Sequence, residues 1–178
     1  AGRLGRSSFG TELLTATDTV DADRIADELD KFNQERRTIE SYVLDSADKQ
    51  VNEEKLNKKL LVVYGEDWHE GVIGIIASRL KDKYHRPCVV ITVSNGKAKG
   101  SGRSIKGIDL GNLVIAAKQA GIIDSGGGHS MAAGLSIKES KIEELSDFFE
   151  NQLSVSQSKV SDEKMIYVDS LISSSGIN

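Results

Sequence analysis

The chain has 178 residues, of which 38% are hydrophobic and 28% are charged, with a net charge of −4. This composition favours one soluble domain with a packed core and excludes nucleic-acid binding by bulk positive charge. Cys88 is the single cysteine, which excludes a disulfide framework and indicates a reducing compartment. No run reaches the roughly 20 apolar residues of a membrane span, and no signal peptide is visible. Both ends look cut, so we expect a fragment of a longer protein.

Residues 21 to about 50 carry one helical stripe of apolar residues, and the rest of this segment is charged. Asp21 or Asp23 could cap its start. The pattern predicts a long, largely solvated connecting helix. The stripe consists of Ile25, Leu29, Phe32, Ile39, Val43 and Ala47.

Two continuous apolar runs, residues 60–64 and 88–93, are typical of strands that are covered on both faces. Between them, residues 71–85 predict a helix that stops before Pro87. Strand, helix and strand in this order predict a parallel pair. We therefore expect an α/β fold with a mixed, mainly parallel sheet flanked by helices and preceded by the long connecting helix.

The glycine-rich segment 97–105 predicts an edge strand or a loop. Residues 109–121 predict a helix with Asp109 as its cap and Gly121 just past its end. Residues 132–137 predict another strand.

Ser140 is expected to cap the last helix, with Glu143 completing a capping box and an apolar face of Ile142, Leu145, Phe149 and Leu153. A polar linker at 154–164 and the start of a strand at 165–172 are expected to follow.

The stretch "GSGRS" could bind an anion. In an extended segment Ser101, Arg103 and Ile105 would share one face, with Gly102 and Ser104 on the other. A hydroxyl beside a guanidinium suits phosphate oxygens. The surrounding basic residues are Lys97, Lys99 and Lys106, and a solvated basic loop is the alternative.

The run "GGGHSMAAG" is either a flexible turn or a cradle whose backbone amides hold an anion. His129 would add a donor. Paired with "GSGRS", the cradle is the better hypothesis.

In "GEDWHEGVIGI", Asp67 could cap a helix, Trp68 could stack on a base or simply pack, and His69 could donate to a phosphate. The stretch lies at a strand end, where α/β sheets bind ligands.

The three histidines lie far apart in the sequence, and one cysteine offers no thiolate set, so we expect no metal site. Phosphodiester cleavage assisted by metals needs clustered ligands, so we expect none from this chain alone.

Four ordered blocks, "NQERRTIE", "DWHEGVIGIIASRLKDKYHRPCVV", "KGSGRSIKGIDL" and "GGGHSMAAGLSI", together with the opening "AGRLG", resemble the RecJ family of single-stranded-DNA-specific exonucleases. The resemblance implies the end of a catalytic domain at 1–20 and a connecting helix at 21–57. It further implies the substrate-binding domain associated with Asp-His-His phosphoesterases at 58–154, and a linker leading to an oligonucleotide-binding fold at 155–178.

The family's catalytic domain, with its Mn²⁺ or Mg²⁺ ions, would precede this chain, and the fragment alone would be inactive. The resemblance implies a 5′ to 3′ exonuclease of DNA repair and recombination in the bacterial cytoplasm. Single-stranded DNA would be its partner, with a single-strand-binding protein and a helicase as further partners.

By matching motifs, the strand would contact Arg3, Ser101, Arg103, Ser104, Gly126, Gly127, Gly128 and His129, beside Trp68 and His69 from the analysis above. The alternatives are a phosphodiesterase for short RNAs or cyclic dinucleotides, and a non-catalytic binding module.

Overall fold

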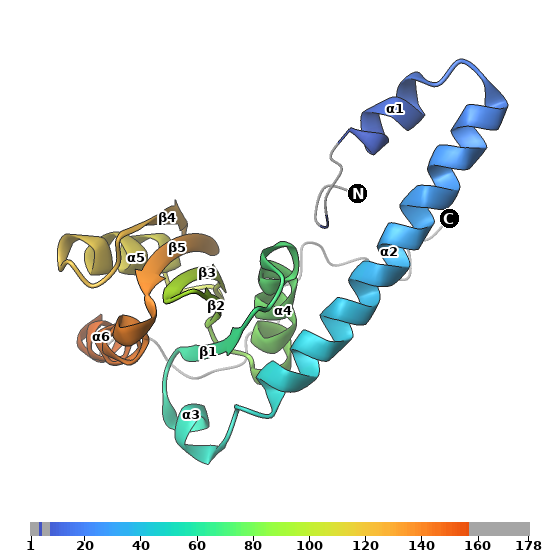
Figure 1. Ribbon diagram of the computed structural model, residues 1–178. Helices are drawn as coiled ribbons and strands as arrows, with labels where there is room; N and C mark the ends of the chain where they lie inside the picture. Colours follow the sequence, from blue (N-terminus) through green and yellow to red (C-terminus); the bar gives the residue numbers. More distant parts are fainter. Residues whose placement is uncertain (1–3, 5–7, 157–178) are drawn as a thin grey trace, which may run out of the picture.

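The computed structural model describes residue 4 and residues 8–156. One very long helix extends away from a body built on a single sheet (Figure 1). The elements are α1 (Phe9–Thr15), α2 (Thr19–Asp48), α3 (Glu53–Asn57), β1 (Leu61–Glu66), α4 (Glu70–Tyr84), β2 (Cys88–Ser94), β3 (Lys97–Arg103), α5 (Leu110–Gln119), β4 (Ser125–His129), β5 (Ala132–Lys138), a 3₁₀ turn (Glu139–Lys141) and α6 (Ile142–Ser156). Within these residues, no helix is both long and apolar enough to cross a membrane.

The long helix predicted from residue 21 to about residue 50 is confirmed as α2, and its role as a connector stays a prediction. Its cap is Asp18, whose carboxylate accepts from the Val20 amide at 3.0 Å. The prediction of Asp21 or Asp23 as the cap was wrong, because the helix begins earlier. The segment 21–57 contains two helices, because Asn52 is extended and caps α3 separately.

The sheet has the strand order β1-β2-β3-β5-β4. The α/β fold class with a mixed sheet is confirmed, and β1 and β2 are parallel as expected. The expectation of a mainly parallel sheet was wrong, because the remaining pairings are antiparallel. Asn95 and Gly96 join β2 to β3 with positive φ angles of 53° and 71°, as a tight hairpin turn requires.

The segment Lys97–Arg103 was expected at an edge or in a loop, but β3 lies between β2 and β5. Its glycines make room for large neighbours. A Cβ at Gly102 would come within 2.6 Å of Leu110, and one at Gly100 within 3.0 Å of Leu135. A central strand rich in glycine is stable here because other elements supply the apolar side chains.

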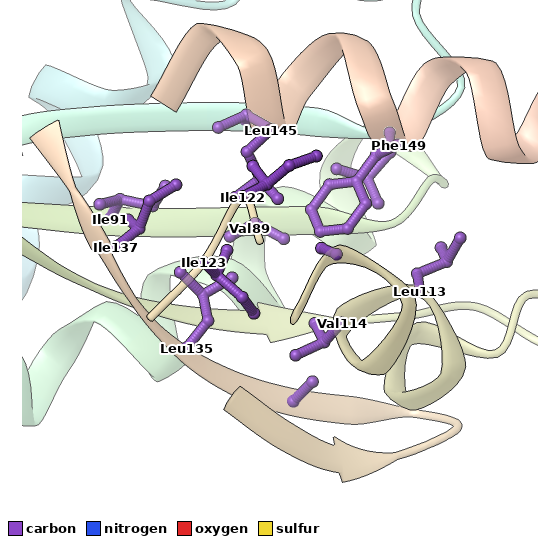
Figure 2. Close-up of a cluster of buried hydrophobic side chains, with 14 of the residues drawn as sticks. Val89, Ile91, Leu113, Val114, Ile122, Ile123, Leu135, Ile137, Leu145 and Phe149 are labelled. Carbon is purple, nitrogen blue, oxygen red and sulfur yellow. The ribbon is translucent and has the colours of Figure 1, made fainter. Parts of the chain in front are cut away.

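Helices cover the sheet on both faces. On one face α5 and α6 enclose a large apolar cluster that includes Val89, Leu135 and Phe149 (Figure 2). On the other face α4 packs on β2 and β3, and the end of α2 packs on α4 and β1. Val63, Ile76 and their neighbours form the apolar cluster of this face.

The predicted cap and end of α5 are confirmed: Asp109 accepts from the Asn112 amide at 2.9 Å, and Gly121 follows the helix with a φ of 71°. The predicted cap of the last helix was wrong, because Ser140 lies inside a 3₁₀ turn that precedes α6.

The apolar face predicted for α6 is confirmed, since its four residues are all buried. Because α6 continues to Ser156, the expected linker cannot begin at 154. The expected strand at 165–172 lies outside the described residues.

Candidate functional site

The face of the sheet that carries α4 is only partly covered. Helix α4 packs on β2 and β3, whereas β4 and β5 show small or polar residues on this side. We call this area the open face. It consists of Lys99, Ser101 and Arg103 of β3, Ala132, Gly134 and Ser136 of β5, and Ser125, Gly127 and His129 of β4.

Strand register arranges the open face in three rows. Residues that pair directly across antiparallel strands point to the same side of the sheet. Small residues therefore form the middle of the array, with Lys99, Arg103 and His129 at its margins. The rows are Lys99–Ser136–Ser125, Ser101–Gly134–Gly127 and Arg103–Ala132–His129.

Ser101 and Arg103 converge as the alternation predicted. Arg103 Nη1 donates to Ser101 Oγ at 3.2 Å. Both are half-buried beside Gly74 of α4, where a Cβ would lie 3.0 Å from Ser101 Oγ. Gly74 was missed in the sequence, although a glycine inside an apolar helix signals a close approach.

The glycine run is neither a turn nor an amide cradle. It forms the edge strand β4, and the turn lies after it, at residues 130–131. Gly126 faces the core and Gly127 faces outward, where an added Cβ would have no atom within 4 Å. Gly127 therefore adds no side chain to the open face, and we call Gly127 together with its partner Gly134 of β5 the glycine floor. The exposed side chain of His129 lies at the end of β4 on the same face.

Ser104 does not join the open face, so its predicted phosphate contact was wrong. It is 1% exposed, and its hydroxyl donates to the Ile108 carbonyl at 2.7 Å. The strand ends at Arg103, and Ile105 packs with the core beneath α5 and α6 instead of lying beside Ser101.

Trp68 is 5% exposed, so stacking on a base was the wrong alternative and packing is confirmed. Its ring covers Gly65, where a Cβ would come within 2.2 Å of the indole. His69, not Asp67, caps α4, with Nδ1 accepting from the Gly71 amide at 3.0 Å.

Asp67 cannot cap α4, because it adopts a φ of 52° and its amide donates to the Val93 carbonyl at 2.9 Å. His69 is exposed at the start of α4, close to the open face.

Of the two basic side chains that β3 places on the open face, one forms an ion pair and the other does not. Lys99 Nζ lies 2.9 Å from Glu70 of α4. Arg103 has no carboxylate within ion-pair distance among the described residues. A shallow hollow of about 360 Å³ separates α4 from the glycine floor. Arg103, whose Nη1 also donates to the Gly102 carbonyl at 2.8 Å, is thus a cation of this face without a carboxylate partner among the described residues.

Two residues named in the sequence analysis remain to be considered. Arg3 lies outside the described residues. Burial raises the pKa of the Cys88 thiol to about 12, which makes it an inert core group.

Residues 8–156 contain no cluster of three or more histidine, cysteine or acidic residues that could hold a metal.

Comparisons with known proteins identify the family and the fold of this chain. The DHHA1 domain model matches residues 57–155. The single-stranded-DNA-specific exonuclease RecJ of Haemophilus influenzae is 42% identical over 155 residues, which are 83% of this chain and 26% of that protein. RecJ of Bacillus subtilis is 35% identical over 81% of this chain and 18% of its own length.

The crystal structure of RecJ from Thermus thermophilus in complex with Mg²⁺ superposes with a TM-score of 0.78 at 28% identity. It covers 87% of this chain and 24% of that chain. A RecJ from the same organism was also solved with Mn²⁺.

The chain belongs to the DHHA1 domain family. Its resemblance to the RecJ exonucleases is confirmed, and it spans about a quarter of the length of the Haemophilus relative.

Proposed function

We propose that this chain is the strand-gripping part of a 5′ to 3′ single-stranded-DNA exonuclease. The observation that supports this most directly is Arg103, which touches Ser101 on the open face and has no carboxylate partner in the described part of the chain. A guanidinium beside a hydroxyl can donate several hydrogen bonds to one phosphate. The 5′-terminal phosphate would bind there.

The glycine floor would let the sugar-phosphate backbone lie close to β4 and β5. Gly127 and Gly134 present no side chain, and His129 would contact the strand at the far margin. Such contacts go to phosphate and sugar, so they position the strand without reading its sequence.

The Mg²⁺ and Mn²⁺ complexes of the relatives indicate divalent metal chemistry in those enzymes. In a longer protein built like them, other residues would hold the ions, water would attack the phosphodiester there, and this chain would orient the strand. Arg3 would contact a phosphate from the catalytic side. We further propose a role in DNA repair and recombination in the bacterial cytoplasm, with a single-strand-binding protein and a helicase as partners.

Substitution of the gripping arginine tests this function. Arg103→Ala should weaken binding of 5′-phosphorylated single strands and reduce the slope of log K against log salt by about 0.7, the value for one lost phosphate contact. Fluorescence anisotropy with a labelled strand across a salt titration measures both quantities.

The matched control is Arg24→Ala, which removes an exposed arginine from the far end of α2 and should leave the slope unchanged. An Arg103→Ala slope equal to that of the unmodified chain would overturn the proposed function.

A further inference from the structure

Gly74 lies inside α4, where the helix faces the two residues that the proposed function assigns to the 5′-terminal phosphate. A Cβ at Gly74 would lie 3.0 Å from Ser101 Oγ and 3.1 Å from Arg103 Nη2. The guanidinium carbon of Arg103 would follow at 3.7 Å, so the three nearest atoms all belong to these two side chains. The polar atoms of the candidate site therefore bound the space that an alanine at position 74 would fill.

Other crowded glycines of the chain have different neighbours. A Cβ at Gly102, for example, would come within 2.6 Å of Leu110, which is an apolar side chain of the core. Helix propensity alone favours alanine over glycine in the interior of α4. Helix formation therefore does not account for Gly74, and none of its three nearest neighbours is an apolar core side chain.

The protein holds the guanidinium of Arg103 through one of its nitrogens. Nη1 donates to Ser101 Oγ at 3.2 Å and to the Gly102 carbonyl at 2.8 Å, which uses both of its N–H bonds. Nη2 and Nε form another edge of the planar fork, and their N–H bonds suit two oxygens of one phosphate. Nη2 is also the nitrogen that lies next to Gly74.

A methyl group at position 74 would disturb this arrangement. Separations of 3.0 and 3.1 Å are shorter than ordinary van der Waals contact, so one of the partners has to move. The guanidinium is the far end of a long side chain with many rotamers, so it can move more easily than the helix backbone. Its hydrogen bond to Ser101 is already 3.2 Å long and would weaken on displacement.

We propose that Gly74 is a positioning residue for Arg103. Its missing side chain lets the guanidinium lie against α4 and present Nη2 and Nε to the 5′-terminal phosphate. Gly74 acts through Arg103 and Ser101. This inference rests on the proposed function.

The test compares single strands that carry a 5′-phosphate with the same strands that carry a 5′-hydroxyl. The unmodified 178-residue chain should prefer the phosphorylated strand. Gly74→Ala should reduce this preference roughly 10-fold, the effect of one hydrogen bond to a charged group. In the Arg103→Ala background, Gly74→Ala should change neither affinity, because the side chain through which it acts is absent. Fluorescence anisotropy measures all four proteins.

The matched control is Gly10→Ala, which also replaces a helical glycine, and its Cβ would have no atom within 4 Å. Helix α1 lies far from the sheet, so this variant should keep the full preference for phosphate (Figure 1).

A second readout needs no DNA. The Nε–H signal of Arg103 in a ¹H–¹⁵N spectrum, assigned by its loss in Arg103→Lys, should shift in Gly74→Ala and stay in place in Gly10→Ala.

The two readouts distinguish failure of the positioning role from failure of the proposed function. Phosphorylated strands that bind Arg103→Ala as tightly as the unmodified chain would refute the proposed function, while the Nε–H signal still reports whether Gly74 positions the side chain. An unshifted signal in Gly74→Ala, or an equal loss of affinity for both kinds of strand, would overturn the inference.

Stability provides the remaining outcome. If Gly74→Ala does not fold, the double variant Gly74→Ala with Arg103→Ala decides the question by urea unfolding. A folded double variant would support steric coupling between position 74 and Arg103. An unfolded double variant would overturn it, because the methyl group would then clash with the packing of α4 itself.

Discussion

Neighbouring glycines of β4 have different surroundings because they face opposite sides of the sheet. A Cβ at Gly126 would lie 2.7 Å from Val114 and 2.9 Å from Ile123 in the core. A Cβ at Gly127 would enter open space above the floor. Two adjacent glycines thus have different surroundings: Gly126 is packed against the core, and Gly127 faces open space.

We therefore predict opposite results for two alanine variants. Gly126→Ala should destabilise the fold by about 1–3 kcal/mol through overpacking. Gly127→Ala should leave stability nearly unchanged but weaken binding of single strands, because its methyl group raises the floor. Urea unfolding and strand anisotropy on both proteins measure this, and equal loss of stability in the two variants would contradict it.

Elements whose own sequence has an apolar pattern could be predicted. Elements that are packed by apolar side chains from distant parts of the sequence could not. The continuous apolar runs of β1 and β2 were sufficient to predict both strands. The central position of β3 depends on Leu110 and Leu135, which are distant in sequence and fill the space above Gly102 and Gly100. The hairpin between β2 and β3 has a local signal, because Asn-Gly is the dipeptide preferred in two-residue turns, but the sequence analysis did not use Asn95-Gly96.

The same distinction holds for the site. Alternation along β3 was enough to place Ser101 beside Arg103. The burial of Ser104 follows from the turn that begins after β3, and the burial of Trp68 follows from its packing on Gly65. Such contacts arise from tertiary structure, and a local pattern does not contain them.

The junction of α2 and α4 contains a titratable contact. Asp48 accepts from Lys83 Nζ at 2.7 Å and from the Tyr84 hydroxyl at 2.8 Å. The hydrogen bond from Lys83 holds the pKa of Asp48 below its ordinary value of 3.8. This contact therefore stabilises the fold above about pH 4, and its contribution is lost as pH falls through the lower folded pKa.

We predict that Asp48→Asn lowers the Tm at pH 7 and that the difference from the unmodified chain shrinks toward pH 2–3. Asp45→Asn removes a fully local pair with Lys49 and should have a smaller effect. Thermal circular dichroism at several pH values makes the comparison. A difference that grows with acidity would contradict the linkage.

At the scale of the whole molecule, a buried carboxylate fixes the long helix against the sheet body. Glu40 of α2 is 2% exposed and forms ion pairs with Arg36 of its own helix and Arg79 of α4. Removing the partners of a buried charge is far more costly than replacing the whole group by apolar residues. We therefore expect the network to orient α2 more than it adds net stability.

The difference in cost between unpairing Glu40 and replacing the whole ion-pair group gives a prediction for the contact between α2 and α4. The double variant Arg36→Met with Arg79→Met leaves Glu40 buried and unpaired, and it should lose about 3–5 kcal/mol of unfolding free energy. Adding Glu40→Leu should restore most of that loss, because no charge is then buried. Urea unfolding of the three proteins measures it. A triple variant as unstable as the double would show that the ion pairs add net stability that apolar residues cannot replace, which contradicts this expectation.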